Sequence, residues 1–180
     1  MAIISDKEVV ILGMLYEKPM YGYEIEKQIN ETSMRDWTKI GFSSIYYILK
    51  KLKSKKLIKS EITLNEKNQT RKIYHISNQG KEAVKNAVKS ILSNQETVIW
   101  RIDLGLAYLN ILDKNDIIAS LYEYKKTIET KLNCYDELLA YLKNIQCSEN
   151  RYELAYRPKY LLKAELEWVE NFISKTNSKH

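Results

Sequence analysis

Apolar residues recur at helical spacing over the first third of the chain. Helices are predicted over Asp6–Tyr16, with Asp6 as a possible N-cap, over Tyr21 to about Thr32, and over Gly41–Lys56. In the third helix the apolar residues lie at i, i+3, i+4 and i+7 and form one stripe: Ile45, Ile48, Leu49 and Leu52. A stripe of this width predicts a helix that packs on the other two.

Strand spacing follows the third helix. Leu57–Leu64 and Arg71–Ile76 are apolar at alternate positions in part of each and predict two strands around a polar tip. Their apolar face would come from Leu57, Ile58, Ile62 and Tyr74. An amphipathic helix over Lys81–Asn94, capped by Ser77 or Asn78, completes the order of a winged helix-turn-helix.

The polar face of the third predicted helix carries hydroxyls, tyrosines and lysines. Hydroxyls and aromatic rings can approach bases or sugars, and ammonium groups meet phosphates. We therefore expect contacts to double-stranded DNA from Ser43, Ser44, Tyr46, Tyr47 and Lys50 on the helix, and from Lys67, Thr70, Arg71 and Lys72 on the wing. Tyr46 lies at the edge of the buried face, and packing on Tyr23 or Leu49 is the competing interpretation. Lys53, Lys55 and Lys56 are expected to add to the positive electrostatic field around the helix rather than to make specific contacts.

Charge is distributed unevenly. Residues 1–90 hold 17 Lys and Arg against 10 Asp and Glu, a net +7, whereas residues 91–180 hold 12 against 13. Residues 50–72 alone carry nine basic groups and two acidic ones. A basic run is often only a solvated surface, but this asymmetry indicates a polyanion-binding module joined to a second part.

Residues 95–180 are predicted to be helical throughout. A long helix is expected from Asp116 to about Ile145, capped by Asp113 or Asn115, and a final helix over Lys159–Ser174. Apolar residues repeat at coiled-coil spacing, and some thirty residues of helix would extend about 45 Å, so we expect a partner copy to cover them. The expected dimer interface is Leu121, Ile128, Leu132, Tyr135, Leu139, Leu142, Leu162, Leu166, Val169 and Ile173. An intramolecular three-helix bundle could use the same stripes.

These patterns give the fold class. The protein is expected to be mainly α with a small two-stranded β-wing. Residues 1–90 would form the winged helix-turn-helix DNA-binding domain, and residues 91–180 an all-α helical dimerisation domain. A two-fold dimer would read two half-sites of a pseudo-palindromic operator.

One family resemblance is specific. The segments Val10–Leu15, Tyr21–Ile25, Ser43–Tyr46 and Arg71–Ser77, with Pro19, Leu57-Ile58 and Gly80, resemble the PadR family of bacterial transcriptional regulators in unbroken order over about residues 8–85. The chain departs from the family at Tyr47, where proline is common, and at Ser43, often glycine. The resemblance implies a winged helix-turn-helix and a C-terminal helical region that interlocks with a partner copy.

Other chemistry finds little support. Cys134 and Cys147 are not spaced as a CxxC pair, His75 and His180 offer no ligand spacing, and no GxSxG, P-loop or HExxH motif occurs. We expect no enzyme activity, no metal and no cofactor. Without a long apolar run or a signal segment the protein is expected to be cytoplasmic, with no membrane partner.

An effector site is harder to read. Fourteen tyrosines and three tryptophans could receive a small aromatic or hydrophobic ligand, and some PadR-like regulators release DNA on binding phenolic acids or hydrophobic drugs. Trp100, Tyr108 and Trp168 are the candidate pocket residues, with core packing as the alternative. The expected function is a homodimeric transcriptional repressor, relieved by such an effector. A winged-helix protein-interaction module without DNA binding is the alternative.

Overall fold

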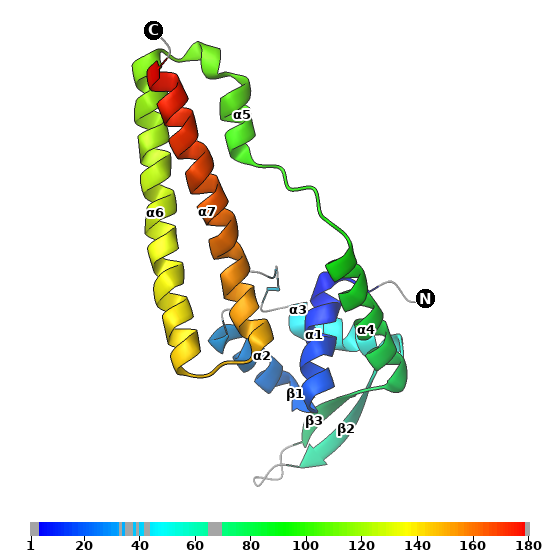
Figure 1. The fold of residues 1–180 in the computed structure, drawn as a ribbon. Coiled ribbons are helices and arrows are strands. Elements are labelled where there is room, and N and C mark those ends of the chain that lie inside the picture. Colours follow the sequence, from blue (N-terminus) through cyan, green and yellow to red (C-terminus); the bar gives the residue numbers. More distant parts are fainter. Residues whose placement is uncertain are drawn as a thin grey trace. The chain divides into compact units, whose positions relative to one another are not determined.

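The computed structural model describes residues 4–32, 34, 38, 40–41, 44–64 and 70–178 (Figure 1). The chain divides into two compact units, Met1–Thr97 and Val98–His180. Among the described residues, no helix has both the length and the apolar character needed to cross a membrane. The expected mainly α architecture with a small β-wing is confirmed, as is the winged-helix fold of the first unit.

The N-terminal unit alternates helices and short strands. Its elements are α1 (Asp6–Glu17), β1 (Met20–Tyr21), α2 (Gly22–Glu31), α3 (Ser44–Ser54), β2 (Ile58–Leu64), β3 (Thr70–Ile76) and α4 (Asn78–Ser93). The strands form one antiparallel sheet in the order β1-β3-β2. β2 and β3 are the predicted wing, and β1 is a third strand that the alternation of apolar residues had not revealed because it is only two residues long.

The core of this unit is the predicted stripe of α3 and its partners. All four stripe residues are buried, and they pack with apolar residues of α1 and α2: Ile11, Leu12, Leu15, Ile25 and Ile29. α3 ends where Lys56 adopts a left-handed conformation (φ 59°), which lets the amide of Leu57 bond to the carbonyl of Leu52. The chain then turns directly into β2.

The wing is only partly as expected. Leu57 and Ile58 are buried and Tyr74 is half-buried, so these residues do supply an apolar face. Ile62 does not, because its side chain is 69% exposed. It pairs with Lys72 beyond the part of the ribbon that the helices cover.

Two helix starts are set by serine. The N-cap of α1 is Ser5 rather than Asp6, and its amide donates to the carboxylate of Glu8 at 2.8 Å. α4 has Ser77 as its N-cap, which accepts from the amide of Gly80 at 3.0 Å.

The C-terminal unit is helical from residue 101 onward, not from residue 95. Residues 95–100 have no regular secondary structure. They are followed by α5 (Arg101–Ala107), a 3-10 turn at Leu109–Ile111, α6 (Lys114–Asn144) and α7 (Glu149–Ser178). Asp113 caps α6 by accepting from the amide of Asp116. α7 starts ten residues earlier than the sequence predicts and contains Pro158 in its interior.

α6 and α7 form an antiparallel pair (Figure 1). Their facing sides enclose two clusters of buried residues, one made by Leu121, Ile128, Leu132, Val169 and Ile173, the other by Leu139, Leu142 and Ala155. Tyr124 joins the helices further, because its hydroxyl donates to Glu165 at 2.8 Å. This bond, the neighbouring carboxylate and above all burial raise the pKa of Tyr124 to about 12.

Within one copy of the chain, this pairing covers most of the residues predicted for the dimer interface. Seven of the ten residues predicted to form a dimer interface are buried inside the chain, and Tyr135, Leu162 and Leu166 are half-buried. α7 has 30 residues and is long enough to pack along an α6 of 31 residues. The seam is thus largely filled by the pairing of α6 with α7 within the chain, and which surface a second copy covers stays a prediction.

Candidate nucleic-acid interface

The outer face of α3 presents the residues expected to read DNA. Tyr46 and Tyr47 are 54% and 68% exposed, and Lys50 is also exposed. Ser44 is half-exposed, and its hydroxyl donates to the carbonyl of Gly41, so it also helps to start the helix. Ser43, and Lys67 on the wing, lie outside the described residues.

The ring of Tyr46 lies against Gly22 at the start of α2. A Cβ at Gly22 would lie 2.8 Å from Cε1 of the Tyr46 ring, closer than real contacts allow. Only glycine at the start of α2 therefore lets the ring rest there. Its remaining surface is open, so the tyrosine is both packed and available.

A cleft of about 320 Å³ lies between α3 and the sheet. We call it the α3–wing cleft. Lys50 and Lys53 of α3 face Lys72 of β3 across it, and Lys53 Nζ donates to Ser60 Oγ at 2.8 Å. Its other lining residues are Tyr46, Leu49 and Tyr74. Burial, and to a smaller extent the neighbouring Tyr46, raises the pKa of Tyr74, which keeps its hydroxyl protonated. Three ammonium groups with hydroxyls beside them suit a phosphate backbone.

Arg71 is positioned by tyrosines that the sequence analysis did not include in the site. Its guanidinium lies 5.2 Å from the centre of the Tyr23 ring, and Nη1 donates to the Tyr23 hydroxyl at 3.3 Å. Tyr21 stacks on Tyr23 with ring centres 5.6 Å apart. The pairing of Tyr21 with Ile73 brings this stack beside the wing, and no local pattern could have predicted that register.

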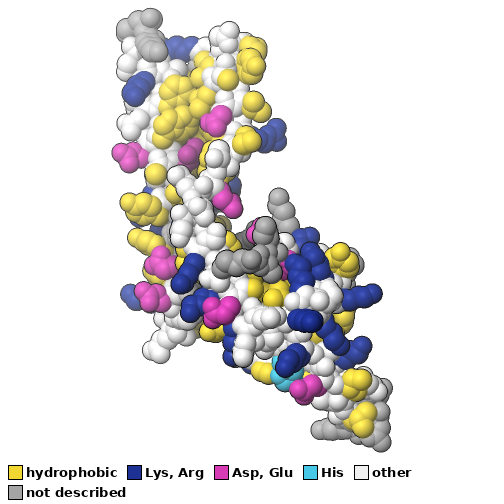
Figure 2. All heavy atoms as spheres, turned by 90° about the vertical axis from the view of Figure 1, so that its right-hand side faces the viewer, with side chains coloured by type: hydrophobic (Ala, Val, Ile, Leu, Met, Phe, Trp, Pro, Cys, Tyr) yellow, Lys and Arg dark blue, Asp and Glu magenta, His cyan; other side chains and the backbone are white. Residues whose placement is uncertain are grey.

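The wing residues line a second hollow next to the first. Thr70, Arg71 and Lys72 are exposed on β3 and share this hollow with Tyr23 and Tyr46. Figure 2 shows one face of the molecule, on which Lys and Arg side chains gather over the N-terminal unit. The structure therefore brings together Tyr46, Lys50 and the three described wing residues into one basic, tyrosine-rich surface.

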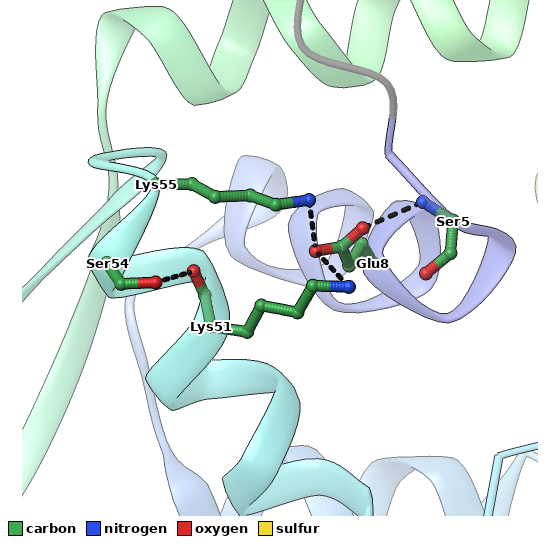
Figure 3. Close-up of polar contacts among 5 residues, drawn as sticks. All are labelled: Ser5, Glu8, Lys51, Ser54 and Lys55. Atoms are coloured by element: carbon green, nitrogen blue, oxygen red, sulfur yellow. Dashed lines mark hydrogen bonds and ion pairs between the residues drawn. The ribbon is translucent and has the colours of Figure 1, made fainter.

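Two lysines of the same region turn the other way. Lys51 and Lys55 approach the carboxylate of Glu8 on α1, at 3.6 Å and 2.7 Å (Figure 3). Lys55, expected to contribute to the general field, is therefore an ion-pair partner within the domain. A sequence separation of 47 residues hides this contact from any local pattern.

A pocket of about 220 Å³ in the C-terminal unit contains two of the three candidate effector residues. Trp100 and Trp168 line it together with Ile102 and Leu106, and Asp103 and Glu165 add two carboxylates. Trp168 also stacks on Phe172, with ring centres 5.6 Å apart. Tyr108 is not among the lining residues; its ring is 62% exposed elsewhere on the unit.

Comparison with known proteins identifies a family for most of the N-terminal unit. Residues 11–86 match the model of the transcriptional regulator PadR-like family. The chain belongs to the PadR-like family. Proteins of this family are transcriptional regulators rather than enzymes. The matched residues run from α1 into α4 and contain the α3–wing cleft.

Solved PadR structures resemble both units. Bacillus subtilis PadR in complex with operator DNA is 20% identical, with a TM-score of 0.76 over 96% of this chain and 99% of that one. The same protein in complex with p-coumaric acid is 20% identical, with a TM-score of 0.74 over 96% of both chains. A PadR-like transcriptional regulator from Bacillus cereus is 19% identical, with a TM-score of 0.61 over 97% of both chains. These likenesses establish the fold across the chain. No curated protein matches the sequence at a significant level.

Proposed function

We propose that this PadR-family regulator binds double-stranded operator DNA with α3 and the wing, and that it represses transcription as a homodimer. The observation that carries the proposal is the α3–wing cleft, where Lys50, Lys53 and Lys72 converge beside the exposed Tyr46 and the half-buried Tyr74. An interaction-type winged helix has no need for this concentration of positive charge. The complex of Bacillus subtilis PadR with operator DNA supports the same use of the fold.

Salt dependence tests the DNA contact. We expect the protein to shift a fragment of its own upstream region, and Lys50→Ala to weaken binding and to reduce the slope of log K against log salt by about 0.9, the value for one phosphate contact. Lys163→Ala, an exposed lysine on α7, is the matched control and should leave the slope unchanged. An unaltered slope in Lys50→Ala would remove this residue from the interface. Absence of binding at low and high salt would favour the interaction module.

We propose a different dimer surface from the seam that α6 and α7 bury. Residues 98–112, here called the 98–112 segment, expose large apolar side chains at Val98, Ile99, Leu104, Tyr108, Ile111 and Leu112. Exposed apolar surface of this extent in a short stretch is typical of an interaction site. A second copy of the chain would remove it from water and place two reading helices on one operator.

The proposed effector pocket also has a definite chemistry. Its tryptophans suit a flat aromatic ring, and Asp103 and Glu165 favour a neutral or cationic ligand over a carboxylate. A ligand that binds one conformation of the regulator more tightly than another shifts the population toward that conformation. The operator affinity can then change by at most the difference in ligand-binding free energy between the two conformations. The p-coumaric acid complex of Bacillus subtilis PadR supports effector control in this fold, but with a carboxylate ligand that this pocket does not match in charge.

Tryptophan fluorescence distinguishes these ligands. We expect saturable quenching by benzyltrimethylammonium, weaker quenching by p-coumarate, and loss of the cation response in Asp103→Asn. Trp100→Phe is a control for the reporter, because it should remove the part of the signal change that comes from Trp100 and leave the part from Trp168. Equal quenching by the anion, or none by either ligand, would contradict the proposed effector chemistry.

A further inference from the structure

Glu8 is the one ionisable side chain that is fully buried among the residues that the structure describes. Its side chain is 1% exposed, although it lies in the first turn of a helix, where carboxylates normally stay in water. A buried carboxylate is strongly unfavourable unless it is paired and hydrogen-bonded. Its partners therefore reveal what it stabilises.

Both oxygens of Glu8 are used (Figure 3). Oε1 accepts from Lys55 Nζ at 2.7 Å and lies 3.6 Å from Lys51 Nζ. Oε2 accepts from the backbone amide of Ser5 at 2.8 Å. In the close-up the two lysine side chains leave the end of α3 and its turn and converge on α1, where Ser5 fixes the carboxylate from the other side.

The electrostatic balance favours the charged carboxylate. Burial alone raises the pKa of Glu8, but the hydrogen bonds from Lys55 and from the Ser5 amide, with the charges of Lys55 and Lys51, outweigh it and lower the pKa overall. Glu8 is thus a buried anion at neutral pH. Its charge holds both ammonium groups on the core side of the domain.

The same helix carries its other lysines elsewhere. At about 100° per residue, Lys51 lies about 100° around α3 from Lys50 and about 160° from Lys53. Lys50 and Lys53 line the α3–wing cleft, whereas Lys51 and Lys55 meet Glu8. The lysine block that is continuous in the sequence is therefore divided between two faces.

We propose that Glu8 is a positioning residue of the DNA-reading helix: it withholds Lys51 and Lys55 from DNA and anchors the C-terminal end of α3 to α1. This inference rests on the proposed DNA binding by α3. It assigns phosphate contact to the cleft lysines and gives the other two a place in the fold. It also makes the number of phosphate contacts depend on a residue outside the interface.

The test compares single variants in the full-length protein by fluorescence anisotropy with the upstream DNA fragment over a salt series. Lys51→Ala and Lys55→Ala should keep the wild-type slope, whereas Lys50→Ala reduces it by about 0.9. Glu8→Gln keeps the side-chain volume and removes the anion that pairs with Lys51 and Lys55, so its slope should become steeper, by about 0.9 for each of these lysines that then contacts a phosphate. Glu17→Gln removes the same charge from an exposed position of α1 and should leave the slope unchanged.

A second measurement does not depend on DNA. Amide hydrogen exchange at Lys51–Ser54 should be faster in Glu8→Gln than in the wild type and unchanged in Glu17→Gln, because only the first loses the anchor. Unchanged exchange in Glu8→Gln would overturn the anchoring role, and a reduced slope in Lys51→Ala would overturn the withholding role. If Glu8→Gln does not fold, the salt slopes of Lys51→Ala and Lys55→Ala test the withholding role. Amide hydrogen exchange in the same two variants then tests the anchoring role. If the wild type does not bind DNA, the proposed function is contradicted. Hydrogen exchange would still test whether Glu8 anchors α3 to α1.

Discussion

Gly80 lets the first turn of α4 lie very close to the start of the sheet. A Cβ on this residue would lie 2.1 Å from the carbonyl oxygen of Leu57 and 2.8 Å from Cγ1 of Ile76. Ser77, the N-cap of the same helix, donates to the carbonyl of Leu57 at 3.0 Å. The first turn of α4 is thus fixed against the start of β2 by one hydroxyl and by one missing side chain.

Gly80→Ala should therefore destabilise the protein. Overpacking costs about 1–3 kcal/mol, and the upper part of that range applies because the obstacle is a backbone carbonyl. Gly13→Ala in α1 is the matched control, since a Cβ there meets nothing within 4 Å and alanine improves helix propensity by up to about 1 kcal/mol. Urea unfolding of both variants measures the difference. Equal stability of the two variants would contradict the close approach.

At the residue scale the sequence predicted local features and missed distant ones. Asp113 and Ser77 were among the expected caps because a cap acts within three residues. The pairing of Glu8 with Lys55 and that of Arg71 with Tyr23 join residues far apart in the chain, and their geometry follows from packing. Asp6 was wrong as a cap because Ser5, one residue earlier, forms the capping pair with Glu8.

At the element scale, the apolar stripes of α6 and α7 were visible in the sequence but their partner was not. A stripe shows that a helix buries one face; it does not say which surface covers that face. The missing information was the length of α7, which Pro158 concealed because proline usually ends a helix. With its first residues at 149–158 included, α7 is long enough to pair with all of α6.

Ile128→Ala tests this pairing. The side chain is 2% exposed between α6 and α7, so its truncation should destabilise the protein by about 2–5 kcal/mol without changing its oligomeric state. Leu138→Ala, on the same helix but 41% exposed, should cost much less. Thermal unfolding and sedimentation together give the answer. Dissociation of Ile128→Ala into monomers with little loss of stability would return the seam to the dimer interface.

At the scale of the whole molecule, the charge distribution and the fold were the most predictable features. The fold and the positive charge of the N-terminal unit follow from apolar spacing and from counting lysines. The basic cleft could not be predicted in detail, because β3 brings Lys72 opposite Lys50 only after the sheet has formed. Assembly is the least predictable level, since most of the apolar residues that would suit a partner are already covered within one copy of the chain.

Ile99→Glu should convert the proposed dimer into monomers. Its side chain is 91% exposed in the 98–112 segment, so a charge there leaves the folded chain intact but would be buried unpaired at a dimer interface. Ile62→Glu, on the wing and also largely exposed, is the matched control and should keep the dimer. Sedimentation equilibrium measures both. A dimer of unchanged affinity in Ile99→Glu would place the interface elsewhere.

The division of α3 into a buried and an exposed face has an evolutionary consequence. Tyr47 and Lys50 are exposed, so substitutions there leave the core intact and are free to explore new operators. Lys51 and Lys55 have less of that freedom, because loss of either positive charge removes one partner of the buried carboxylate on α1. A lineage of such regulators would thus diversify its targets through half of the helix while the other half stays under folding constraint.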